Sequence, residues 1–88
     1  EKRMTFCIAV FRSRTQVMEF IEYMQSGGID CAAVNTPVEA RIGCGISARF
    51  PAVYLNYAKN VVEKLRLNTF RGFFTVNRGI GGVSVRRF

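Results

Sequence analysis

The chain has 88 residues, 49% of them hydrophobic, a length that suits a single domain with one core and no large composite active site. It contains no histidine, which excludes histidine-based acid–base catalysis, Cys-His nucleophile pairs and histidine-containing metal sites supplied by this chain. The formal charge is +7, and residues 64–88 carry six basic side chains and no acidic one, so we expect a cationic surface there.

The three cysteines, Cys7, Cys31 and Cys44, are an odd number with no CxxC pair. This pattern argues against a disulfide framework and against a four-ligand zinc site, so we expect no metal and no cofactor. The apolar runs are too short for a membrane span and no leader pattern is present, so a cytoplasmic location is the default expectation.

The first half of the chain predicts a strand followed by a helix. Thr5 to Phe11 is a continuous apolar run of β-forming residues, as expected for a central strand. Ser13 opens a capping box with Gln16, which predicts a helix from Arg14 to about Ser26, closed by the glycine pair that follows. The apolar stripe of this helix is Val17, Phe20, Ile21 and Met24.

The second half predicts two strands, a helix and another strand. Ile29 to Thr36 is a short strand, and Ile46 to Phe50 alternates apolar and polar residues as a half-buried strand does. Pro51 fits the first position of a helix running to about Arg66, and Thr69 to Asn77 is aromatic and β-branched, which favours a strand. The stripe of the second helix is Tyr54, Ala58, Val61 and Leu65.

This order is the ferredoxin-like βαββαβ arrangement, an α+β fold in one domain over residues 1–88. We expect an antiparallel sheet with strand order 4-1-3-2 and two helices on one face. Gly72 suggests a bulge or a close backbone approach in the last of these strands. We expect residues 1–3 to be an extra or disordered start, and residues 78–88 to form either an additional strand or a loose tail.

In that fold the start of the third strand meets the end of the first, so Cys44 and Gly45 would lie near the N-terminus of the first helix. A thiolate is an anion, and such a position lowers a cysteine pKa without a histidine. The groups expected to favour the anion are the unpaired backbone N–H groups of residues 13–16 and the guanidiniums of Arg12, Arg14 and Arg41.

The other cysteines and the aromatic residues have simpler interpretations. Cys7 lies inside the apolar first strand and is expected in the core, and Cys31 should lie at the opposite end of the sheet from Cys44. The run containing Phe70, Phe73 and Phe74 is expected to pack in the core rather than stack on bases. From the residues alone, Cys44 is as consistent with an inert cysteine in a glycine-rich loop as with a reactive one.

The segment PVEARIGCGISARF, Pro37 to Phe50, resembles the hallmark of the selenium/sulfur carrier protein-like family: a proline and an arginine, a short stretch, Cys-Gly, then an apolar strand with an arginine before a final aromatic residue. Phe11 to Cys31 is similar to the family's strand end, capped helix and glycine turn, and Phe50 to Leu65 to its second helix. The chain departs from the family at residues 41–43, where Arg-Ile-Gly replaces small polar residues, and in the tail after Asn77.

The resemblance implies a small carrier, rather than an enzyme with its own turnover, that would hold sulfur or selenium on Cys44 between donor and acceptor proteins. The residues expected to bind around Cys44 are Gly43, Gly45, Arg12, Ser13, Arg14, Arg41 and Arg49.

Two other functions compete with the carrier. A binding module would use the basic C-terminal part to hold nucleic acid or an acidic protein, with Cys44 incidental. A regulatory domain would form a homodimer through a sheet edge and bind a small anion. We favour the carrier, and we expect no specific nucleic-acid binding.

Overall fold

The computed structural model describes residues 5–37, 45–79 and 82–87. The chain folds as an α+β domain in which strands and helices follow one another in the expected sequence. The elements are β1 (Thr5–Phe11), α1 (Arg14–Ser26), β2 (Ala32–Asn35), β3 (Ile46–Pro51), the 3-10 turn η2 (Ala52–Tyr54), α2 (Leu55–Lys64), β4 (Phe70–Gly79) and β5 (Gly82–Arg87).

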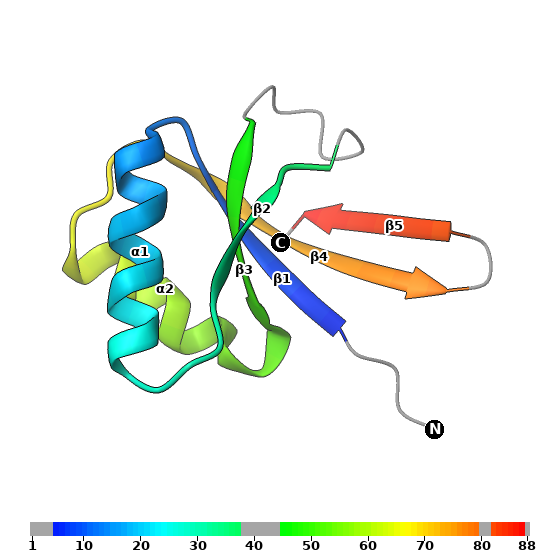
Figure 1. Cartoon of the computed structure of the whole chain (residues 1–88), viewed down its shortest axis with the longest axis horizontal. Coiled ribbons are helices and arrows are strands. Elements are labelled where there is room, and N and C mark those ends of the chain that lie inside the picture. The colour runs from blue at the N-terminus through cyan, green and yellow to red at the C-terminus, as the bar shows by residue number, and fades with distance from the viewer. Residues whose placement is uncertain (1–4, 38–44, 80–81, 88) are drawn as a thin grey trace.

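The described strands form one sheet in the order β2-β3-β1-β4-β5, and every neighbouring pair is antiparallel. The order of the first four strands is consistent with the ferredoxin-like arrangement. The fifth strand pairs with β4, so the segment that was expected to be either a strand or a tail extends the sheet. Figure 1 shows the β4–β5 hairpin reaching away from the two helices.

Both helices pack against the same face of the sheet, here called the helix-covered face (Figure 1). This is possible because alternate residues of a strand point to opposite faces, and the small or aromatic residues Cys7, Ala9 and Phe11 of β1 point towards the helices. The helix residues that complete this core are Val17, Phe20, Ile21, Met24, Ala58 and Val61.

The opposite face, here called the helix-free face, has its own smaller apolar cluster. Ile8 and Val10 of β1 lie there beside Phe74 and Val76 of β4, and Val34 packs against them. The continuous apolar composition of β1 therefore serves both faces of a central strand. The aromatic residues of β4 are divided in the same way, since Phe73 joins the helix-covered core and Phe74 the helix-free cluster.

Gly72 lies at an irregularity in the pairing of β1 with β4. Val10 pairs with Gly72, but Phe11 pairs with Phe70, so Arg71 is an extra residue on β4. The φ angle of Gly72 is 144°, a conformation that side-chain-bearing residues rarely adopt. The bulge suggested by this glycine is confirmed.

Three details around the second strand and second helix differ from expectation. The second strand is shorter, because only residues 32–35 pair with β3. Pro51 is the last residue of β3, since its backbone is extended, and the 3-10 turn η2 separates it from α2. Tyr54 was wrongly placed in the core: it lies in that turn and is 39% exposed, whereas Leu65 is half-buried against the core.

Within the described ranges, neither helix has the length and apolar character that crossing a membrane would require.

Candidate functional site

Four of the expected site residues lie together at one end of the sheet. Val10 pairs with Ser47, so the end of β1 and the start of β3 are neighbours, and Arg12 and Gly45 lie two residues beyond this pair. The amide of Thr36 donates a 3.2 Å hydrogen bond to the Gly45 carbonyl, which brings the end of β2 to the same place. Ser13 and Arg14 follow at the start of α1.

Arg41, Gly43 and Cys44 lie outside the described residues. Arg49 is described, and it lies further along β3, paired with Ile8. Its side chain is on the helix-free face, and its guanidinium carbon lies 4.7 Å from the centre of the Phe6 ring.

The N-terminus of α1 is more fully bonded than the sequence suggested. Ser13 caps the helix, since its Oγ accepts a 3.2 Å hydrogen bond from the Gln16 amide. The second half of a capping box would return the Gln16 side chain to the Ser13 amide. Instead, the Ser13 amide donates to Thr69 Oγ1 at 3.2 Å. The amides of Ser13 and Gln16 therefore already donate hydrogen bonds within the protein and are not available to bind an anion.

Thr69 links the start of α1 to the start of β4. Gln16 Oε1 accepts from both the Thr69 amide (3.0 Å) and Thr69 Oγ1 (2.6 Å), and the Arg12 amide donates to the Thr69 carbonyl at 3.0 Å. Gln16 Nε2 also donates to Asn68 Oδ1 at 2.9 Å. Residues more than fifty positions apart make these bonds, so no local motif in the sequence could have indicated them.

The charged side chains described at this end of the sheet, those of Arg12 and Arg14, are both positive. Arg12 and Arg14 are both exposed. They lie at the N-terminus of α1, the end at which the helix dipole is positive. Gly45 is exposed too. An anion presented here would meet two guanidiniums and the partial charge of the helix, although two of the helix amides are already bonded.

The two described cysteines are buried thiols. Cys7 and Cys31 are 0% and 2% exposed and neither forms a disulfide. Burial raises the pKa of Cys7 from 9.0 to about 11. Burial is also the main cause that raises the pKa of Cys31 to about 12, with a further increase from Asp30 and an opposing effect of Arg49. Both therefore stay protonated at neutral pH, and the expectation that Cys7 belongs to the core is confirmed.

Cys31 lies at the far end of the sheet from Gly45. It directly precedes Ala32, which pairs with Arg49, whereas Gly45 bonds to the other end of the same strand pair. No group of three or more cysteine and carboxylate side chains that would suit a metal ion occurs among residues 5–37, 45–79 and 82–87.

Comparison with protein families gives one finding. The family model described as "Putative Se/S carrier protein-like" matches residues 6–71, from the start of β1 to the bulge in β4. A search of curated proteins found no match, and a search of solved structures found none either.

Proposed function

The chain belongs to the "Putative Se/S carrier protein-like" family, and from this premise we propose that it carries sulfur or selenium on the thiol of Cys44 and delivers it to a partner protein. The family match, which spans both helices, the first three strands and the start of β4, carries this proposal. The geometry at the end of the sheet supports it and supplies the chemistry.

Cys44 directly precedes Gly45 in the chain, so the peptide bond ties it to the end of β3 that neighbours Arg12. Positive charge from Arg12, Arg14 and the α1 terminus favours the thiolate over the thiol and so lowers the cysteine pKa. The thiolate is the form that attacks sulfur. Arg49 has no part in this proposal, because its side chain lies further along β3 on the helix-free face.

The described cysteines cannot serve in place of Cys44. Transfer between proteins requires a sulfur atom that the partner's reactive group can reach, and the side chains of Cys7 and Cys31 are enclosed in the helix-covered core. Their raised pKa values also keep the thiolate form scarce at neutral pH.

The loading step is a thiol exchange with a persulfide on a donor protein. The Cys44 thiolate attacks the outer sulfur of the donor persulfide, a new S–S bond forms on Cys44, and the donor cysteine leaves as a thiolate. The number of S–S bonds is unchanged, so no external oxidant or reductant is needed. Delivery is the same exchange with Cys44 as the leaving thiolate.

Incubation with a cysteine desulfurase and free cysteine tests the proposal. The protein should gain the mass of one sulfur atom, a reductant should remove it, and peptide mapping should locate it on Cys44. Cys44→Ser should gain nothing, whereas Cys31→Ala, which removes a buried thiol, should load as the parent does. An unmodified Cys44 with every donor tried would contradict the carrier function.

A further inference from the structure

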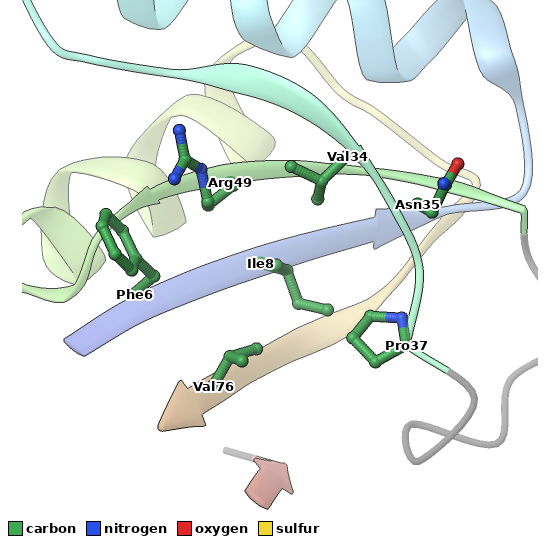
Figure 2. Close-up of a pocket in the computed structure, with 7 residues that line it drawn as sticks. All are labelled: Phe6, Ile8, Val34, Asn35, Pro37, Arg49 and Val76. Atoms are coloured by element: carbon green, nitrogen blue, oxygen red, sulfur yellow. The ribbon is translucent and has the colours of Figure 1, made fainter. Parts of the chain in front are cut away.

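The helix-free face contains a pocket that the carrier proposal does not use. Its volume is about 270 Å³, and it lies over the middle of the sheet, between β2 and β4 (Figure 2). Its described lining is mostly apolar, with one charged residue and one asparagine. The lining residues are Phe6, Ile8, Val34, Asn35, Pro37, Arg49 and Val76.

Arg49 is the single charged residue in this described lining, and its bonding is incomplete. The Nε atom is buried and has no hydrogen-bond partner within the described part of the chain. Buried polar groups in native structures are nearly always bonded, because an unsatisfied one costs about 1–3 kcal/mol. An orphaned guanidinium nitrogen beside a pocket therefore indicates a missing acceptor.

The other lining residues indicate what kind of ligand would fit the pocket. The centre of the Phe6 ring lies 4.7 Å from the guanidinium carbon, and Ile8 and Val34 add further hydrocarbon to the pocket lining, so a ligand needs an apolar body as well as an acceptor group. A guanidinium binds a carboxylate through two parallel hydrogen bonds, and its flat shape also stacks on the Phe6 ring. One cation balances one negative charge, which favours a carboxylate over a doubly charged phosphate.

We propose that this pocket, with Arg49 as the anion-binding residue, binds a small carboxylate whose apolar body rests on Ile8, Val34 and Val76. Asn35 lies at the rim of the pocket. A pocket of this volume has room for about nine water molecules at ~30 Å³ each, which matches a single ring or a short branched chain. Binding requires a small turn of the Arg49 side chain, because its Nε is covered in the unliganded form.

Titration with benzoate, followed by amide chemical shifts in NMR spectra, tests this inference, and neutral benzamide is the matched probe. Benzoate should give saturable shifts centred on Ile8, Val34 and Arg49, with an affinity in the millimolar range typical of so small a ligand. Benzamide should bind at least about tenfold more weakly, because it lacks the charge that pairs with the guanidinium.

Variants separate a specific site from general attraction to a basic protein. Arg49→Met should weaken benzoate binding at least about tenfold, whereas Arg71→Met, which removes the same charge from an exposed position outside the lining, should leave it within about twofold. Arg49→Lys keeps the charge but not the two parallel bonds and should be intermediate. Val34→Phe keeps the charge but fills the pocket, so it should abolish binding.

Equal binding of benzamide and benzoate, or equal losses in Arg49→Met and Arg71→Met, would overturn the inference. The benzamide comparison uses the parent protein, so it can overturn the inference even if a variant fails to fold. The inference is independent of Cys44, and the titration should give the same result in Cys44→Ser, in which the carrier function is removed.

Discussion

The two faces of the sheet are built from the same strands but are completed differently. On the helix-covered face, α1 and α2 enclose an aromatic core in which Phe50 lies between Phe20 and Phe73, with ring centres 5.9 and 6.0 Å away. On the helix-free face, a smaller apolar cluster borders a pocket lined in part by Arg49, whose Nε has no hydrogen-bond partner among the described residues. One face is closed by packed side chains, and the other retains space beside a guanidinium nitrogen that has no partner in the described part of the chain.

The largest difference between the faces should appear in the free energy of unfolding. Phe50→Ala removes a fully buried ring from the helix-covered core and should cost about 3–5 kcal/mol. Ile8→Ala, its counterpart on the helix-free face, should cost less, about 2–3 kcal/mol, because the cluster is smaller and borders a pocket. Urea titration followed by circular dichroism measures the free energy of unfolding of both variants. An equal or larger cost for Ile8→Ala would show that the helix-covered face does not contribute more to stability than the helix-free face.

A smaller effect is expected where the helix layer is joined to the sheet. Thr69→Val keeps the side-chain shape but removes the Oγ1 that bonds the Ser13 amide and Gln16 Oε1, so it should cost about 1–2 kcal/mol. Thr15→Val, an identical change at an exposed position in the first turn of α1, is the control and should stay within about 0.5 kcal/mol. Similar unfolding midpoints for the two variants would mean that Thr69 does not fix the helix start.

The smallest effect is expected at Arg49. Arg49→Met removes the stacking on Phe6, worth about 0.5–1 kcal/mol, but also removes a buried donor without a partner, so the two changes nearly cancel. The thermal midpoint should move little. A decrease of more than about 2 kcal/mol in the free energy of unfolding would show that Arg49 is a structural residue, because substitutions at surface positions rarely cost so much.

The sequence was most informative where structure depends on local spacing. The apolar run at residues 5–11, the serine cap and the helical stripe at residues 17–24 identified β1 and α1 with their observed bounds. Gly28, with φ of 81°, ends α1 as the glycine pair predicted, since its amide and that of Ile29 bond back to Gln25 and Met24. These features lie within one or two turns of chain.

Features that depend on contacts between distant residues could not be predicted. Helical periodicity placed Tyr54 in the core, but η2 intervenes and turns its side chain outward. The bonds of Thr69 to Ser13 and Gln16 join segments that only the folded sheet brings together. The pocket beside Arg49 likewise exists only after β1, β2, β3 and β4 have paired. From the sequence, Arg49 was expected only as one of the cations around Cys44.

The reactivity of the three cysteines tests the central claim most directly. Folded protein is alkylated with iodoacetamide across a range of pH, and digestion and mass spectrometry give the rate at each cysteine. We expect Cys44 to react in the folded state with an apparent pKa below the usual value of about 8.5, and Arg12→Ala and Arg14→Ala to raise that pKa. Cys7 and Cys31, with pKa values near 11 and 12, should react only after unfolding. If Cys44 reacts no faster than a free model thiol, or if Cys31 reacts alongside it in the folded protein, the assignment of Cys44 as the carrier thiol is wrong.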